Sequence, residues 1–260
     1  MTRADEDALL AVALEAARAA GAELRARFGR RQGGVRAKSG PTDLVSDADL
    51  AAEAAIRDVL CARRPDDGIL AEEGGATAGG ALRWVVDPLD GTINFLFGVP
   101  AWGVSVGCED AEGGLVGVVL DPMRDECFAA TRSGAATLDG EPIQARLQGD
   151  LADALVATGF SYDAAVRARQ ATVITRLLPR VRDIRRVGAA SLDLCWTACG
   201  RFDAHYERGL KPWDIAAGAL IAARAGLEVR PLAASEEDPE GVVVTRAGLM
   251  EELLELVVGR

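Results

Sequence analysis

Apolar positions recur with a helical period near the N-terminus. Between residues 5 and 28 they return every three or four residues, which predicts one amphipathic helix. Its apolar face would comprise Leu9, Val12, Ala13, Ala16, Ala20, Leu24 and Phe28. A second helix is predicted to begin at Ser46, because S-D-A-D has the spacing of a capping box that ends at Asp49.

Strand-like runs occupy the middle of the chain. Four short runs between residues 84 and 131 are separated by turn residues, which predicts an antiparallel meander. From about residue 150, strands and helices alternate. This combination favours a layered α+β sandwich over a doubly wound parallel sheet. We expect two closely packed lobes, an N-terminal α+β lobe over residues 1–145 and a C-terminal α/β lobe over residues 146–260.

The composition limits the classes of partner. The 260 residues include 29 basic and 40 acidic ones, which gives a formal net charge of −11. This balance disfavours nucleic-acid binding, because the phosphate backbone needs clustered Lys and Arg. No apolar stretch reaches the roughly 18 residues that cross a bilayer, and the N-terminus lacks the basic segment of a signal peptide. We expect a soluble cytoplasmic protein with no membrane partner.

Two carboxylates flank a proline where an apolar run ends, in W-V-V-D-P-L-D-G-T. Asp87 and Asp90 would lie at the end of a strand, and Pro88 would stiffen the turn between them. Gly91 and Thr92 would then begin a helix, whose first backbone N–H groups can meet an anion. One interpretation makes the aspartates ligands of a hard cation such as Mg²⁺. The other makes them turn formers and a helix cap.

Further acidic positions favour the first interpretation. Glu72 follows a strand-like run in I-L-A-E-E-G-G, and Asp214 opens an apolar helix in K-P-W-D-I-A-A-G. Sequence signals for a G-x-S-x-G nucleophile, a Walker loop or a dinucleotide fingerprint are missing. The one histidine, His205, lies in the alternating run D-A-H-Y-E and is interpreted as a structural strand residue. Divalent cations between the carboxylates and the substrate would allow this acidic protein to bind a phosphate.

Together these segments resemble the inositol monophosphatase family. W-V-V-D-P-L-D-G-T-I-N-F is similar to its first signature and L-K-P-W-D-I-A-A-G to its second. A-K-S-G-P-T-D-L-V-S-D-A-D-L-A-A-E, I-L-A-E-E-G and R-R-V-G-A-A-S-L-D-L-C match further blocks in order, so the resemblance covers roughly residues 5 to 230. It is strongest to actinobacterial inositol-1-monophosphatases. It implies an αβαβα sandwich of the sugar-phosphatase type, a homodimer, lithium sensitivity and Mg²⁺-dependent hydrolysis of a small phosphate monoester, foremost inositol 1-phosphate.

The resemblance also implies a set of metal ligands. Glu72, Asp87 and the backbone carbonyl of Leu89 would hold one Mg²⁺. Asp87, Asp90 and Asp214 would hold a second, so that Asp87 bridges the two ions. A third, weaker Mg²⁺ would rest on Glu72 and water molecules.

Catalytic and substrate-binding roles follow from the same resemblance. Thr92, hydrogen-bonded to Asp49, would orient or deprotonate the attacking water, and Glu72 completes the catalytic set. Asp49 is also explained as a capping residue, and the two uses are compatible. The substrate-binding set would comprise Asp90, Gly91, Thr92, Gly188, Ala189, Glu207 and Lys211. Within this set, the Gly91 and Thr92 amides would receive phosphate oxygens, and Glu207 would accept substrate hydroxyls.

The preferred substrate stays open within this class. The segment T-I-N-F favours inositol-type members over phosphoadenosine phosphate phosphatases. The glutamate at position 207 is not typical of the histidinol phosphate branch. Fructose 1,6-bisphosphate remains an alternative. Lys211, where animal members have histidine, would widen or recharge the substrate pocket. Lys38, in K-S-G-P-T-D, is either a solvated loop residue or part of a metal-linked segment. A binding partner in transcription or ribosome maturation is the alternative from another class, since some bacterial relatives have such a role.

Overall fold

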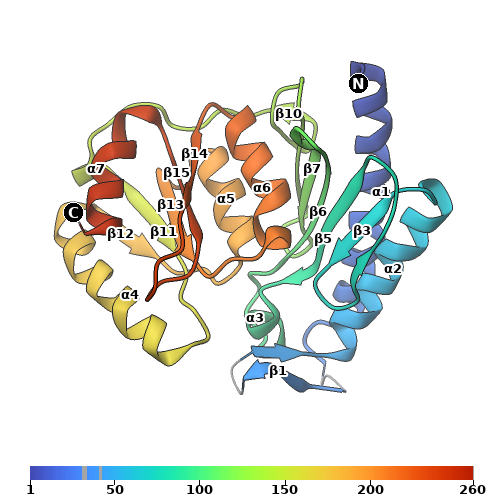
Figure 1. The fold of residues 1–260 in the computed structure, drawn as a ribbon, viewed down its shortest axis with the longest axis horizontal. Coiled ribbons are helices and arrows are strands. Elements are labelled where there is room, and N and C mark those ends of the chain that lie inside the picture. Colours follow the sequence, from blue (N-terminus) through green and yellow to red (C-terminus); the bar gives the residue numbers. More distant parts are fainter. Residues whose placement is uncertain (31–33, 41–42, 260) are drawn as a thin grey trace.

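The computed structural model describes residues 1–30, 34–40 and 43–259. Helices and sheets alternate in layers across the molecule (Figure 1). The outer helices α1 (Arg3–Arg27) and α2 (Asp47–Arg63) pack on one face of a large sheet, and α5 (Ala190–Ala198) and α6 (Pro212–Arg224) pack on its other face. A smaller sheet follows, covered by α4 (Ala164–Leu177) and α7 (Ala247–Val258). The predicted αβαβα sandwich is confirmed.

The large sheet has eight strands in the order β10-β9-β8-β7-β6-β5-β3-β4. It is antiparallel except for the pair of β3 and β5. Its strands are β3 (Gly68–Ala71), β4 (Gly75–Thr77), β5 (Arg83–Asp90), β6 (Gly103–Asp110), β7 (Gly113–Asp121), β8 (Glu126–Thr131), β9 (Thr137–Leu138) and β10 (Glu141–Pro142). The predicted meander is therefore confirmed, and it corresponds to β5 through β8.

The small sheet has five strands in the order β12-β11-β13-β15-β14. They are β11 (Leu155–Thr158), β12 (Asp183–Arg185), β13 (Ala204–Arg208), β14 (Glu228–Leu232) and β15 (Gly241–Thr245). Short elements complete the described chain, namely β1 (Arg36–Gly40), β2 (Asp43–Val45), α3 (Thr92–Leu96) and two 3-10 turns, Leu151–Asp153 and Leu178–Arg180. None of the described helices combines the length and the apolar character that a membrane span requires.

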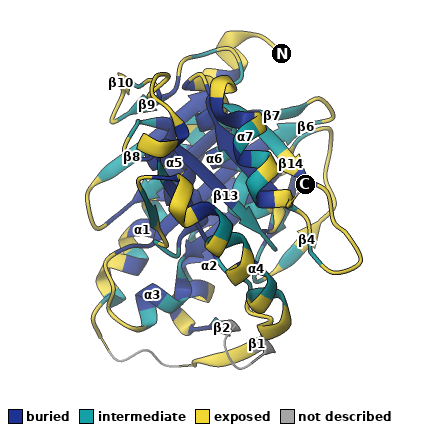
Figure 2. Cartoon of the chain, turned by 90° about the vertical axis from the view of Figure 1, so that its left-hand side faces the viewer, coloured by how far each residue is buried: buried dark blue, intermediate teal, exposed yellow. Residues whose placement is uncertain are grey.

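The helices between the two sheets come from the C-terminal lobe and contact both sheets. Every residue of α5 is buried, as expected for a helix with sheets on both sides (Figure 2). Its core cluster combines Val119 and Phe128 of the large sheet with Val242 and Val244 of the small one. This shared core explains the close packing of the lobes. A boundary between residues 145 and 146 would fall in the segment that joins the two sheets, and it stays a prediction.

Both helices of the N-terminal part follow the sequence pattern. Ser46 is the N-cap of α2, and it and Asp49 form both hydrogen bonds of the capping box. The apolar face of α1 is buried at Leu9, Ala13 and Leu24. His205 lies within β13, in agreement with its prediction as a strand residue.

Candidate active site

A cleft of about 930 Å³ opens where the first lobe meets the start of α6 and the end of β13. It is lined by most of the predicted site residues, namely Glu72, Asp87, Leu89, Asp90, Gly91, Thr92, Gly188, Glu207, Lys211 and Asp214. Asp49 and Ala189 are buried and are not among the lining residues. The side chain of Lys38 lies outside the described part of the chain.

Strand pairing brings the first acidic residues together. β3 and β5 run parallel with Ala71 opposite Val86, so Glu72 and Asp87 follow at the same edge of the sheet. Beyond this point β5 contains one extra residue relative to β6, because Asp87 pairs with Ser105 but Asp90 pairs with Gly103. Residues three apart face opposite sides of a regular strand. The bulge instead lets Asp87 and Asp90 face the same cleft.

Hydrogen bonds fix the turn that follows Asp87 and the start of α6 beside that turn. The Leu89 N–H donates to Asp87 Oδ1 at 2.9 Å, as the turn-former interpretation of Asp87 predicts. Ser105 Oγ donates to the Trp213 carbonyl at 3.1 Å and holds the first turn of α6 against β6. Asp214 Oδ2 accepts from the Lys211 N–H at 2.6 Å. Burial, together with the charge of Asp90, raises the pKa of Asp214 to about 8.

Asp90 links the two lobes. Its Oδ2 accepts from the Ser191 N–H at 2.7 Å and from Ser191 Oγ at 2.5 Å. Ser191 lies in the first turn of α5, whose N-cap residue Ala189 has no side-chain oxygen to cap it. Asp90 therefore satisfies a helix start that its own sequence leaves uncapped. Burial raises the pKa of Asp90 to about 6, and the Ser191 hydrogen bonds oppose this shift.

The turn after Asp90 requires a glycine. Gly91 has a φ of 90°, and a Cβ there would lie 3.1 Å from the carbonyl oxygen of Ala101. Thr92 Oγ1 then lies 3.0 Å from Asp49 Oδ1 and 3.1 Å from the Leu89 carbonyl oxygen. Asp49 Oδ2 accepts from the Ser46 N–H at 2.9 Å. One carboxylate thus caps α2 and contacts Thr92 as well.

Glu207, at the end of β13, also lines the cleft. A Cβ at Gly159 would overlap the Glu207 carboxylate, so a glycine makes room for this side chain. Burial is the main cause that raises the pKa of Glu207 to about 8, and the charges of Asp214 and Asp90 add to it.

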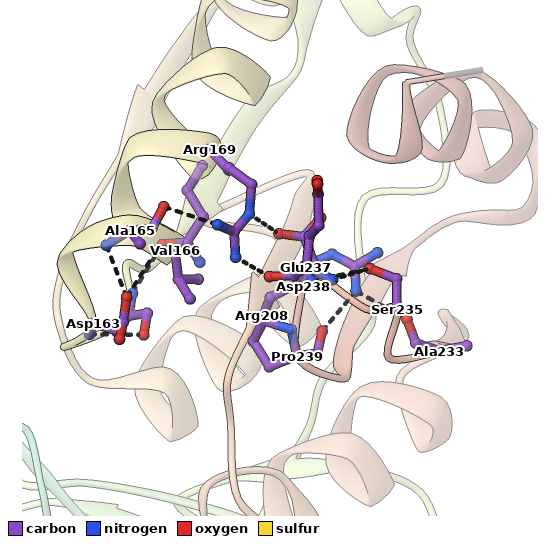
Figure 3. A network of polar contacts seen from close by, with 12 residues as sticks. Asp163, Ala165, Val166, Arg169, Arg208, Ala233, Ser235, Glu237, Asp238 and Pro239 are labelled. Carbon is purple, nitrogen blue, oxygen red and sulfur yellow. Dashed lines mark hydrogen bonds and ion pairs between the residues drawn. The ribbon is translucent and has the colours of Figure 1, made fainter.

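An outer rim closes the cleft beside α4, and its polar network is drawn in Figure 3. Arg169 on α4 pairs with Asp238, with Nε and Oδ1 3.0 Å apart, and its guanidinium also donates to the Glu237 carbonyl. Arg208 Nη1 donates to the Pro239 carbonyl oxygen at 2.7 Å. Because Pro239 lines the cleft, these contacts fix the rim position of the loop before β15.

Four acidic residues of the cleft, Glu72, Asp87, Asp90 and Asp214, form what we call the acidic wall. This group fits a divalent cation. Burial raises the pKa of Asp87 well above its usual range, and the charges of Glu72, Asp90 and Asp214 raise it further. Neighbouring carboxylates disfavour one another's ionisation in this way. When hard cations lie between them, the ionised form of each carboxylate becomes favourable. The donors are all oxygens, which is the ligand set that Mg²⁺ prefers.

A model of the inositol monophosphatase family matches residues 5–258. The chain belongs to this family. It is 43% identical over 240 residues to the Mycobacterium tuberculosis inositol-1-monophosphatase SuhB, covering 88% of this chain and 82% of that protein. It is 38% identical over 221 residues to a Pasteurella multocida protein named Nus factor SuhB, covering 84% and 83%.

Solved structures of similar proteins support the same assignment. The Bartonella henselae suhB protein is 32% identical with a TM-score of 0.88, covering 96% of this chain and 98% of that one. The Thermotoga maritima IMPase is 30% identical with a TM-score of 0.85, covering 100% and 98%. The chain is thus, by homology, a phosphomonoesterase of a metal-dependent family whose substrates are phosphate monoesters.

Several residues that support the site were not predicted. Ser191 and Ser105 position Asp90 and the start of α6, and Asn94 Nδ2 donates to the carbonyls of Ala101 and Val187 at 2.7 and 2.9 Å. Glu53 on α2 accepts from the N–H groups of Glu73 and Gly74, which follow Glu72 directly. The acidic ending of D-L-A-A-E was the one available signal for Glu53.

Replacing Glu53 with glutamine is expected to raise the Mg²⁺ concentration for half-maximal activity about tenfold, because supporting residues typically change metal affinity by roughly 10–100-fold. The substitution weakens the acceptor for the Glu73 and Gly74 N–H groups and leaves Arg57 without its carboxylate partner. Activity titrated with Mg²⁺ measures the effect, with Glu112→Gln on the exposed surface as the matched control. An unchanged Mg²⁺ dependence would show that Glu53 does not position Glu72.

Proposed function

We propose that this protein hydrolyses inositol 1-phosphate to inositol and phosphate in the presence of Mg²⁺. The observation that carries the proposal is the arrangement of one cleft. Its lining includes the acidic residues Glu72, Asp87, Asp90 and Asp214, beside the contact of Thr92 with Asp49, and also Glu207 from β13. A wall of carboxylates suits cations and a phosphate, while a separate carboxylate suits the hydroxyls of a polyol.

The metal ligands are proposed residue by residue. Glu72, Asp87 and the Leu89 carbonyl would hold one ion, Asp87, Asp90 and Asp214 a second, and Glu72 with water a third. Bound Mg²⁺ supplies a water of lowered pKa and stabilises negative charge on the phosphoryl and leaving oxygens.

Thr92 is proposed to orient the attacking water. A hydroxyl has one proton to donate and two lone pairs that accept. When Thr92 donates its proton to Asp49 Oδ1, its oxygen is left to accept a hydrogen bond from the water. The water oxygen then forms the new bond to phosphorus and releases a proton to solvent. The bond between phosphorus and the inositol oxygen breaks, and that oxygen takes up a proton from solvent as inositol leaves.

Substrate contacts are proposed from several elements around the cleft. The Gly91 and Thr92 amides would receive phosphate oxygens at the start of α3, and Gly188 and Ala189 would contribute from the segment before α5. Glu207 would accept polyol hydroxyls. Lys211 is exposed, lines the cleft and adds a positive charge near the substrate.

A second candidate function is a binding role in transcription or ribosome maturation. The relative named Nus factor SuhB, 38% identical, supports it. Recovery of RNA polymerase factors with the tagged protein, equally by the wild type and Asp90→Asn, would favour this role. We further propose a cytoplasmic homodimer that is inhibited by lithium, as expected from the family resemblance.

Phosphate release from a panel of monophosphates tests the proposed function. The panel comprises inositol 1-phosphate, glycerol 2-phosphate, fructose 1,6-bisphosphate, histidinol phosphate and phosphoadenosine phosphate, each with and without Mg²⁺. We expect Mg²⁺-dependent release that is fastest with inositol 1-phosphate. Preference for another ester would replace the substrate and keep the chemistry, whereas no turnover of any ester would contradict the proposal.

A further inference from the structure

Two buried polar side chains lie next to Glu207 and have no role in the proposed mechanism. Asp193 on α5 and His205 on β13 are both fully buried, at 0% exposure. In the described part of the chain, both carboxylate oxygens of Asp193 and both ring nitrogens of His205 lack a hydrogen-bond partner. Buried polar groups in folded proteins are almost always hydrogen-bonded. These two side chains therefore call for a physical explanation.

The fold brings the side chains of Asp193, His205 and Glu207 close together. His205 and Glu207 are two residues apart on β13, so their side chains share one face of the small sheet. That strand packs against α5, which supplies Asp193. His205 is held inside the sheet between Ala157 of β11 and Val244 of β15, so its backbone is fixed on both sides.

The three side chains are close enough for one small group to join them. His205 Nε2 lies 3.9 Å from Glu207 Oε2, and one ligand atom from each of the three residues lies within 4.8 Å of the others. Zinc at about 2.0–2.1 Å from tetrahedral ligands would draw them to about 3.4 Å apart. One oxygen that makes hydrogen bonds of about 2.8 Å in tetrahedral directions separates its partners by about 4.6 Å. The 3.9 Å between His205 Nε2 and Glu207 Oε2 lies between these two values, and the limit of 4.8 Å for the group admits a bridging water.

We propose that His205 and Asp193 are positioning residues, which hold the Glu207 carboxylate through a hydrogen-bonded water so that it meets a hydroxyl of the substrate. The inference rests on the proposed function, because it assigns Glu207 to a polyol. Burial raises the pKa of Asp193 well above its usual range, the charges of Glu207 and Asp90 raise it further, and burial lowers the pKa of His205 to about 3. The positive charge of Arg186 acts on both Asp193 and Glu207.

Substrate discrimination tests this role. His205→Phe keeps an aromatic ring but removes both nitrogens, and we expect it to raise KM for inositol 1-phosphate about tenfold. KM for phenyl phosphate, which has no polyol hydroxyls, should change less than twofold, and so should kcat for both esters. His205→Asn, which retains a donor and an acceptor, should recover part of the loss. Tyr206→Phe, on the other face of the same strand, serves as the matched control and should leave both KM values unchanged.

A double variant tests whether the two residues act as one unit. If His205 works through Glu207, then His205→Phe combined with Glu207→Gln raises KM for inositol 1-phosphate no further than Glu207→Gln alone. Equal KM changes for both esters, or additive effects in the double variant, would overturn the positioning role. Wild-type turnover of phenyl phosphate but not of inositol 1-phosphate would contradict the proposed substrate instead.

The imidazole of the native protein provides a signal that does not require a substitution of His205. His205 is the one histidine of the chain, so its ring nitrogen resonances need no assignment. With Mg²⁺ and inorganic phosphate present, added myo-inositol should shift the ¹⁵N resonances of the ring in the wild type but not in Glu207→Gln. No shift in the wild type would overturn the inference. A stoichiometric shift on adding Zn²⁺ alone would replace the water bridge by a metal site.

Discussion

Asparagine at position 90 is expected to lower Mg²⁺-dependent hydrolysis of the preferred ester about a thousandfold, which corresponds to about 4 kcal/mol of activation free energy. Asp90 lies where the acidic wall meets the start of α5, so its charge serves the cations while Oδ2 accepts from Ser191. The asparagine oxygen can still accept from Ser191, so α5 keeps its cap. The loss should therefore fall on the cation site rather than on the fold.

Phosphate release over a series of Mg²⁺ concentrations, with thermal unfolding measured in parallel, checks this result. Asp58→Asn makes the same chemical change on the exposed face of α2 and should keep activity within twofold of the wild type. More than a tenth of wild-type turnover in Asp90→Asn at saturating Mg²⁺ would show that this carboxylate is dispensable.

The elements that the sequence predicts well are those specified by local chemistry. The capping box of Ser46 and Asp49 is contained in four residues, and the structure confirms both of its hydrogen bonds. The bulge in β5, by contrast, is not specified by local chemistry. It depends on how Asp87 and Asp90 pair with Ser105 and Gly103 on the next strand, and the local sequence contains no information on that register.

The candidate site also combines residues that the local sequence predicts with contacts that depend on tertiary packing. Acidic residues at strand ends and helix starts were recognisable, and the structure places Glu72, Asp87, Asp90 and Asp214 around one cleft. The contact between Asp90 and Ser191 joins residues 101 positions apart, so only the packed lobes reveal it.

His205 was predicted correctly as a strand residue. What the alternating pattern could not reveal is the polar group opposite it, because Asp193 comes from another element. A pattern of apolar and polar positions predicts burial, but it does not identify the partner of a buried polar side chain. Such partners depend on tertiary packing, so the group around Glu207 became visible only in the folded chain.

Without metal, the protein is expected to lose stability as the pH rises from 6 to 8. Burial raises the pKa values of Asp214 and Glu207 to about 8, far above those of the unfolded chain. A group with a raised pKa stabilises the fold below its unfolded pKa, and this contribution is lost as the pH rises through the folded value. In this window the native state holds more protons than the unfolded state. Each retained proton then costs about 1.4 kcal/mol of stability per pH unit.

His205 does not reverse this trend. Its pKa is lowered to about 3, so its contribution is complete above the unfolded value near 6.5 and declines only as the pH falls. Mg²⁺ favours the ionised carboxylates and binds the folded state, so it should restore the stability that rising pH removes. Thermal unfolding with Mg²⁺ and with a chelator should therefore differ little at pH 6 and increasingly towards pH 8. A metal-free protein that becomes more stable over this range would contradict the buried acidic cluster, and a Mg²⁺ effect that persists unchanged in Asp90→Asn would place the cation elsewhere.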